Sequence, residues 1–192
     1  MRYPAAETAE RHKRILDSAS RMFRRDGFEG VSVADVMKAA GLTHGAFYAH
    51  FESKEAMAAA GVERALAEML NLADHAGEAP DPQAAFVTGY LSQRHRDNPD
   101  QGCAMAALGP EIARRTGPVR QAFTTGVRGL IDRLARTVRP AEGADPRAEA
   151  ITMLSTLLGA LVLARAVDDA ALSAEILAAN RANFGLEPEP AQ

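Results

Sequence analysis

Apolar residues recur at intervals of three and four along almost the whole chain, which is the repeat of an amphipathic α-helix. A clear example near the N-terminus consists of Ile15, Leu16, Ala19, Met22 and Phe23. No stretch of five or more residues alternates between apolar and polar side chains, and no β-hairpin turn signal stands between two such stretches. Alanine, which has the highest helix propensity, is frequent. The sequence therefore predicts an all-α protein.

Breaks in this pattern divide the chain into about nine helical segments. Gly27 and Gly41 are expected to end the first two, because glycine readily adopts the left-handed backbone that follows a helix. Ser32 and Ser53 are expected N-caps. A very short third segment runs from about residue 43 to 50, and a long fourth follows Ser53. The later segments are expected around residues 86–91, 103–108, 118–138, 146–167 and 173–184, with a loop at 97–100 and a break at residues 109–110.

Charge is distributed unevenly over the 192 residues, although the net charge is only −3. Residues 1–54 contain nine Lys and Arg against seven Asp and Glu, including all three lysines, whereas residues 55–192 carry a net charge of −5. A weakly basic head on an acidic body fits a chain of which one end meets an anionic polymer. This charge pattern favours an N-terminal unit at 1–54 and a second helical domain at 55–192.

The cysteine count and the lack of targeting segments narrow the class further. The single cysteine, Cys103, excludes an intramolecular disulfide framework and a multi-cysteine zinc site. No run approaches the roughly 20 apolar residues needed to span a bilayer, and the first residues lack the apolar core of a signal peptide. We therefore expect a cytoplasmic protein without a membrane partner.

The segment between Val33 and His50 has the pattern of a helix-turn-helix. The small Ala39 and Ala40 allow two helices to cross closely, and Gly41 can adopt the left-handed backbone that the turn needs. Leu42 and Phe47 supply apolar contacts that fix the crossing. At this point an ordinary helical hairpin remains the alternative.

The exposed positions of the third segment have a composition that is compatible with DNA binding. They are polar, small or aromatic, and none of them is acidic. These positions are Thr43, His44, Gly45, Tyr48, Ala49 and His50. Such a surface suits a helix in the major groove, where polar atoms contact base edges and phosphates.

The stretch from Gly45 to Glu55, Gly-Ala-Phe-Tyr-Ala-His-Phe-Glu-Ser-Lys-Glu, closely resembles the N-terminal domain of TetR-family transcriptional regulators. The resemblance covers roughly residues 8–57 and includes Gly27-Phe28, residues 31–36 and the turn at residues 39–43. It implies an Ω-shaped homodimer in which the first three helices bind operator DNA. The C-terminal helices then hold a ligand pocket and the dimer interface.

The resemblance also implies which residues contact DNA. Thr43, His44 and Gly45 match base-contacting positions at the start of the recognition helix. Tyr48, His50 and Lys54 match phosphate contacts, and Ser32 matches the start of the second helix, which approaches the DNA backbone. Core packing is the alternative for the aromatic residues, and an ordinary solvated lysine is the alternative for Lys54.

The segment 55–192 contains the expected dimer interface and ligand pocket, with the pocket among the fourth to seventh helices. The helix at 146–167 is apolar over most of its circumference, so it must be buried on more than one side. With the helix at 173–184 it is the expected homodimer interface; a central helix of a monomer core is the alternative. The expected ligand contacts, each of which could instead be plain core, are Met69, Phe86, Tyr90, Cys103, Met105 and Phe123, with His95 and Val127 as further candidates.

Cys103 permits an alternative mode of regulation. Residues 101–108 resemble a segment in a subset of the family in which a cysteine opens the sixth helix and, in some members, senses oxidants or electrophiles. A helix N-terminus and nearby Arg114 or Arg115 would lower the pKa of the thiol. A buried small hydrophobe is the other possibility. A metal site formed by His95, Asp97, Asp100 and Cys103 is disfavoured by the Pro99 loop.

No nucleophile–base pair, glycine-rich phosphate loop or metal motif stands out, so an enzyme is not expected and no cofactor is implied. The sequence predicts a TetR-like regulator, a repressor released from a palindromic operator by an unidentified small molecule. The alternative is a redox or electrophile sensor acting through Cys103.

Overall fold

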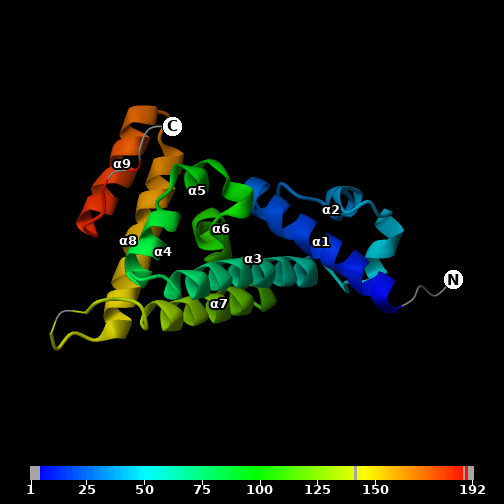
Figure 1. Ribbon diagram of the computed structural model, residues 1–192. Coiled ribbons are helices and arrows are strands. Elements are labelled where there is room, and N and C mark those ends of the chain that lie inside the picture. The colour runs from blue at the N-terminus through cyan, green and yellow to red at the C-terminus, as the bar shows by residue number, and fades with distance from the viewer. Residues whose placement is uncertain (1–4, 141, 188, 190–192) are drawn as a thin grey trace.

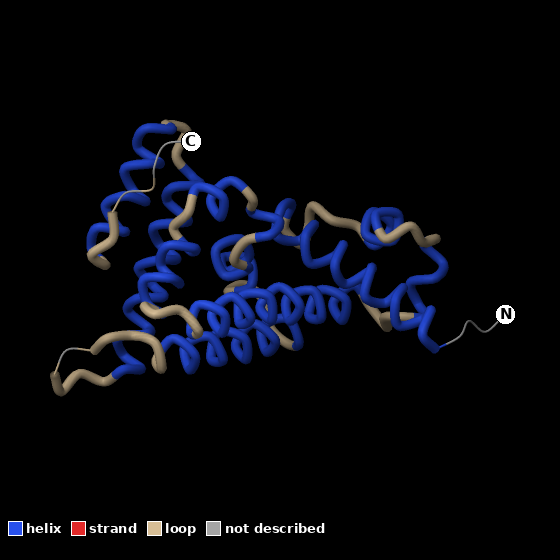
Figure 2. The backbone as a smooth tube through the Cα atoms, viewed as in Figure 1, coloured by secondary structure: helices blue, strands red, loops and turns tan. Residues whose placement is uncertain are grey.

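The computed structural model describes residues 5–140, 142–187 and 189, and within these ranges the chain consists of helices joined by loops and turns (Figure 2). Those ranges hold nine α-helices, two short 3-10 helices and no strand, so the predicted all-α fold is confirmed. The elements in chain order are α1 (Ala5–Asp26), α2 (Val33–Ala39), η1 (His44–Ala49), α3 (Lys54–Gly77), α4 (Pro82–Tyr90), α5 (Gln93–Asp97), η2 (Pro99–Gln101), α6 (Ala104–Ile112), α7 (Pro118–Leu134), α8 (Pro146–Ala166) and α9 (Ala170–Asn183).

The N-terminal elements α1, α2 and η1 form one end of the molecule, opposite α8 and α9 (Figure 1). Ile15 and Phe23 of α1 are buried together with Val36 of α2 and Phe47 of η1. Gly41 has a φ of +70°, which is the left-handed turn that the sequence predicts between α2 and η1. The predicted crossing of two helices on an apolar contact is therefore present.

The 24-residue helix α3 joins this end to the rest of the chain. It packs against α1 at one end and runs side by side with α7 (Figure 1). At Gly61 the close neighbour is the ring of Phe23, 3.3 Å from where a Cβ would lie. At Gly126 of α7, a Cβ would lie only 2.4 Å from Leu66 Cδ1. Glycine at position 126 therefore sets how closely α3 and α7 approach each other.

Helices α5, α6, α7 and α9 pack against α8, whereas α4 packs against α3. Met153, Leu157 and Leu161 of α8 are buried, and α9 packs along the same helix. By length and composition alone, α8 would be long and apolar enough to cross a membrane. Its buried face and its contacts with α6, α7 and α9 are those of a core helix.

Two local predictions were wrong in the region before α7. Residues 97–100 were expected to form a loop, but most of that stretch belongs to α5 and η2, and α5 itself was not expected. The break expected at residues 109–110 does not occur, because α6 continues through Pro110 to Ile112. Pro110 lies in the last turn of this short helix, where the missing N–H removes a single backbone hydrogen bond.

A third difference concerns α9, which begins three residues earlier than expected, because the Asp169 side chain caps it by accepting from Ala171 N–H and Leu172 N–H.

Candidate DNA-binding surface and its connection to the body

The segment η1 presents a small polar surface to solvent, and we call His44–Ala49 the recognition segment. Phe47 is buried and anchors it, whereas Tyr48 is 72% exposed and lies edge-on against Phe47, with ring centroids 5.2 Å apart. His44 and Gly45 are exposed, and no atom lies within 4 Å of where a Cβ of Gly45 would be. A partner can therefore approach the backbone closely at this point.

Thr43 and Ser32 begin the two helices of this motif in different ways. Thr43 is the exposed N-cap of η1, and its side chain makes no capping hydrogen bond. The Ser32 hydroxyl accepts a hydrogen bond from Asp35 N–H, and the Asp35 carboxylate accepts one from Ser32 N–H. This capping box occupies the Ser32 hydroxyl within the protein, so Ser32 acts first as a helix cap.

His50 and Lys54 lie at the junction with α3. The His50 ring is half-buried near His12, with centroids 5.7 Å apart, and His12 itself stacks on Phe51. Burial, followed by the charges of His12 and Arg11, lowers the pKa of His50. His50 is thus a neutral hydrogen-bonding group at neutral pH. Lys54 is the first residue of α3, directly after the capping residue Ser53.

A buried arginine, Arg24 of α1, connects this DNA-binding end to the body. Its side chain is 1% exposed, and Nη1 donates to Gly102 O at 2.9 Å. Its Nη2 pairs with Glu68 Oε2 of α3 at 2.9 Å, and Nε donates to Ser20 O. Loss of Glu68 would leave this buried charge uncompensated, and loss of either carbonyl would leave a buried donor without a partner. Arg24 therefore holds α1, α3 and Gly102 in place relative to one another.

The same peptide group is held from its other side by His95 of α5. Cys103 N–H donates to His95 Nε2 at 2.9 Å, and His95 Nδ1 donates to Tyr90 O at 2.7 Å. These two partners fix the neutral tautomer with the proton on Nδ1. Burial accordingly lowers the pKa of His95 to about 4. A continuous hydrogen-bonded path runs from Arg24 through the Gly102–Cys103 peptide to His95.

A second connection joins α6 to the loop after α1. Glu111 Oε2 accepts a hydrogen bond from Phe28 N–H at 3.0 Å, next to Gly27. A Cβ at Gly27 would lie 2.5 Å from Glu111 Oε1, and the φ of +75° independently favours glycine. Arg115 lies over the Phe28 ring at 4.4 Å and pairs with Glu29 and Glu55.

The residues expected to line a ligand pocket are packed in the core instead of around a large cleft. Phe86, Tyr90, Cys103 and Met105 are each at most 4% exposed. Met69 is also buried, and Phe123 and Val127 are partly buried. The larger clefts in the described part of the chain are lined by other residues.

The expectation of a low thiol pKa at Cys103 is wrong. The thiol is fully buried, and burial raises its pKa although Tyr90 and backbone N–H groups near the start of α6 act in the opposite direction. Arg115 turns away to Glu29 and Glu55 and is no neighbour of the thiol. Within the described ranges, no three His, Cys, Asp or Glu side chains gather closely enough to hold a metal ion.

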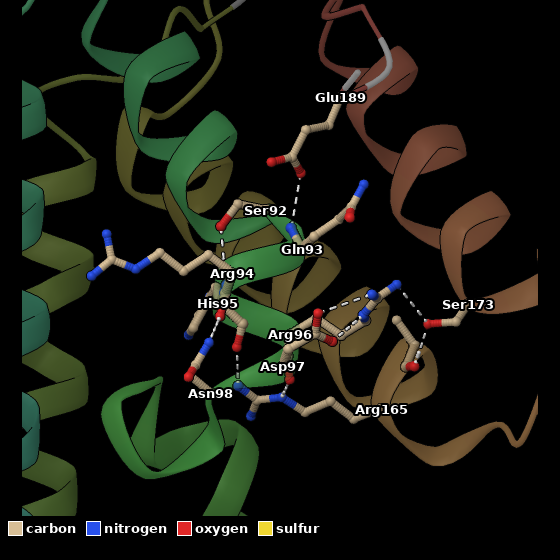
Figure 3. Close-up of polar contacts among 11 residues, drawn as sticks. Ser92, Gln93, Arg94, His95, Arg96, Asp97, Asn98, Arg165, Ser173 and Glu189 are labelled. Atoms are coloured by element: carbon tan, nitrogen blue, oxygen red, sulfur yellow. Dashed lines mark hydrogen bonds and ion pairs between the residues drawn. The ribbon is translucent and has the colours of Figure 1, made fainter. Parts of the chain in front are cut away.

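An open cleft of about 680 Å³ was not foreseen from the sequence. It lies between α5 and the connection from α8 to α9, and its charged lining includes Arg96, Asp97 and Arg165 (Figure 3). Arg165 Nη2 donates to His95 O and Nε to Arg96 O, which places a cation from α8 against the end of α5. The sequence offered no signal for this site, because α5 lacks an apolar stripe.

Known proteins match this chain in both halves. The family model described as "Bacterial regulatory proteins, tetR family" matches residues 15–60, and "Tetracyclin repressor-like, C-terminal domain" matches residues 80–179. The HTH-type transcriptional repressor NemR of Escherichia coli (strain K12) is 28% identical over 131 residues, 65% of either chain. The match thus spans slightly less than two thirds of that relative's length.

Solved structures show the same fold. The reduced form of E. coli NemR aligns with a TM-score of 0.78 at 24% identity, covering 95% of this chain and 99% of that one. A TetR transcriptional regulator from Chloroflexus aurantiacus aligns with a TM-score of 0.77 at 21% identity, covering 97% and 100%. The two family-model matches and the curated relative show that the chain is a helix-turn-helix transcriptional regulator. More narrowly, the chain belongs to the TetR family of bacterial regulatory proteins.

Proposed function

We propose that this chain is a homodimeric repressor that binds a palindromic operator in the cytoplasm, does so without catalysis, and leaves the operator when a small molecule binds. The observation that carries the proposal is the recognition segment, in which Phe47 is buried while Tyr48, His44 and Gly45 face solvent. This is the arrangement needed to hold a rigid polar edge against base pairs. The proposed functional division remains 1–54 for DNA binding and 55–192 for ligand binding and dimerisation.

Within the recognition segment and its flanks, each residue has a specific proposed role. Thr43, His44 and Gly45 contact base edges, because they are exposed at the start of η1. Tyr48 donates its hydroxyl to a phosphate.

His50 and Lys54 complete the proposed phosphate contacts. His50 does so as a neutral hydrogen-bond donor, since its lowered pKa keeps the ring uncharged. Lys54 contributes a positive charge at the start of α3. Ser32 contributes through the backbone at the start of α2, because Asp35 occupies its hydroxyl.

Dimerisation through α8 and α9 is supported by exposed apolar side chains on these helices. Ile151, Val162 and Leu163 of α8 and Leu172 of α9 are large and exposed in the single chain. A two-fold contact would cover them and place two recognition segments in successive major grooves, roughly 34–36 Å apart.

The hydrogen-bonded path through the Gly102–Cys103 peptide could carry the effect of a bound ligand to α1, and so cause the protein to leave the operator. A ligand that moves α5 or the start of α6 would disturb the hydrogen bonds of His95 and Arg24, and Arg24 belongs to α1. Repression is lifted if the ligand favours the conformation in which the two recognition segments no longer match the grooves. The proposed effector contacts are Met69, Phe86, Tyr90, Cys103, Met105 and Phe123. Tyr90 and Cys103 lie on this path, and because five of the six are buried, binding would require this part of the core to open.

An electrophoretic mobility shift on operator fragments selected from the parent genome tests the DNA-binding assignment. We expect His44→Ala and Tyr48→Phe each to weaken specific binding about tenfold or more, because each removes a polar DNA contact worth roughly 1–3 kcal/mol. His75→Ala is the matched control, since His75 is exposed on α3 away from the recognition segment. Unchanged operator affinity in both test variants, with normal folding, would refute the assignment.

Sensing through Cys103 is the second candidate function. The Tyr90 hydroxyl is buried without a nitrogen or oxygen partner in the described part of the chain, and it interacts with the thiol. Burial of the thiol opposes this function because it raises the pKa. The variant Cys103→Ser separates the candidates. Normal release of DNA by oxidants in that variant would exclude a thiol switch, and loss of release would support it.

A further inference from the structure

The cleft between α5 and the α8–α9 connection is lined by Arg165, which makes no close ion pair in the described part of the chain. The carboxylate of Asp97 acts on it from a longer distance and raises its pKa, although by less than burial lowers it. Arg165 is partly buried, and no carboxylate lies within 4.0 Å of its guanidinium in the described part of the chain. Its Nε and Nη2 donate to the carbonyl oxygens of Arg96 and His95 at 3.0 and 2.5 Å. Its Nη1 has no hydrogen-bond partner within those same ranges. Burial lowers the pKa of Arg165, but arginine stays protonated.

The other arginine of the cleft is already neutralised. Arg96 Nε and Nη2 pair with the two carboxylate oxygens of Asp97 at 2.7 and 3.1 Å. Arg96 Nη1 also donates to the Ser173 hydroxyl, which in turn donates to Ala164 O (Figure 3). This group therefore offers polar atoms to a ligand but no net charge. Asp168 is exposed at the edge of the cleft, where solvent screens it.

Small apolar side chains form the rest of the wall. Val167, Ala170 and Ala174 face the same cleft of about 680 Å³. This volume is in the range of small-molecule sites, about 300–1,000 Å³. One unpaired guanidinium beside an apolar wall is complementary to a small organic molecule with one acidic group, because a carboxylate or phosphate supplies the missing charge and accepts from Nη1.

We propose that this cleft binds a small organic acid whose anionic group contacts Arg165. The regulatory consequence rests on the proposed function, since Arg165 holds His95 O and His95 holds the peptide bound by Arg24. An acid that draws Arg165 toward the cleft changes the position of α5 and so acts on α1. The binding event itself requires no DNA.

Titration calorimetry of the full chain with benzoate as the probe tests the site, and benzamide is its uncharged equivalent. We expect saturable binding of benzoate and at least tenfold weaker binding of benzamide. Arg165→Gln is expected to weaken benzoate binding at least tenfold. Arg94→Gln is the matched control, because Arg94 lies on α5, next to the cleft, but is exposed and points away from it (Figure 3). Its benzoate affinity is expected to match that of the unmodified chain.

A second variant keeps the test valid if Arg165→Gln disturbs α5. Ala174→Trp fills the cleft from an exposed position on α9 and leaves Arg165 in place, so it is expected to abolish benzoate binding. Three results would overturn the proposal: no saturable binding of benzoate, equal affinity for benzoate and benzamide, or equal losses in Arg94→Gln and Arg165→Gln. None of them depends on operator binding, so a failure of the proposed function would be seen separately in the mobility shift.

Discussion

The neutral state of His95 makes the stability of this protein depend on pH in a window that can be measured. His95 Nδ1 donates to Tyr90 O, and His95 Nε2 accepts from Cys103 N–H. If Nε2 were protonated, its N–H would face the N–H of Cys103, so two hydrogen-bond donors would meet without an acceptor in a partly buried site. The folded chain therefore resists protonation of His95 down to a pKa of about 4, whereas the unfolded chain takes up the proton near 6.5.

The sign and size of the effect follow from this difference. As pH falls below 6.5, the unfolded state binds a proton that the folded state does not, so the free energy of unfolding decreases. Between pH 7.5 and pH 5, proton linkage with these two pKa values gives a loss of about 2 kcal/mol. The full contribution is lost near pH 4 and below.

Urea unfolding at pH 7.5 and pH 5 measures this loss, and His95→Gln is the comparison because it cannot titrate. The unmodified chain is expected to lose about 2 kcal/mol more than the variant between the two pH values. The difference between the two proteins removes the contribution of His50, whose pKa is also lowered. An equal loss in both proteins would refute the hydrogen-bonded neutral state of His95.

Two further predictions concern packing and capping. In Gly126→Ala the new Cβ would lie 2.4 Å from Leu66 Cδ1, so the free energy of unfolding is expected to fall by about 1–3 kcal/mol. Gly129→Ala is the control, because its Cβ would make an ordinary 3.5 Å contact with Leu70; thermal unfolding distinguishes the two. Ser32→Ala removes the cap of α2 and is expected to cost about 1 kcal/mol by urea unfolding. An unchanged midpoint in that variant would contradict the capping role.

Local signals explain why the N-terminal half was predictable from the sequence. Ser32 and Asp35 together form the N-terminal cap of α2, and Gly41 forms the left-handed turn after it. Each of these signals lies within a few residues of the structure that it determines. Phe47 shows the helical spacing of a buried residue. These features are determined by the nearest neighbours along the chain, so the helix-turn-helix could be predicted without knowledge of the tertiary structure.

The body was less predictable because its site depends on distant residues. The five residues of α5 are mostly charged and carry no apolar stripe; a cap from Ser92 and contacts from Arg165 and Ser173 hold this helix. Apolar spacing also cannot distinguish a core residue from a pocket residue, since both repeat every three or four positions. For this reason Phe86 was a candidate ligand contact although it is packed in the core.

The partners of Arg24 have a consequence for chimeric regulators. A fragment ending at residue 60, where the N-terminal family match ends, would lack Glu68 and Gly102, which hold the Arg24 side chain. It would also lack Glu111, which holds the loop after α1. The DNA-binding end is therefore not an interchangeable module. A transplant onto another effector body would fold correctly only if that body supplied an acceptor for Arg24 and a carboxylate for the Phe28 amide.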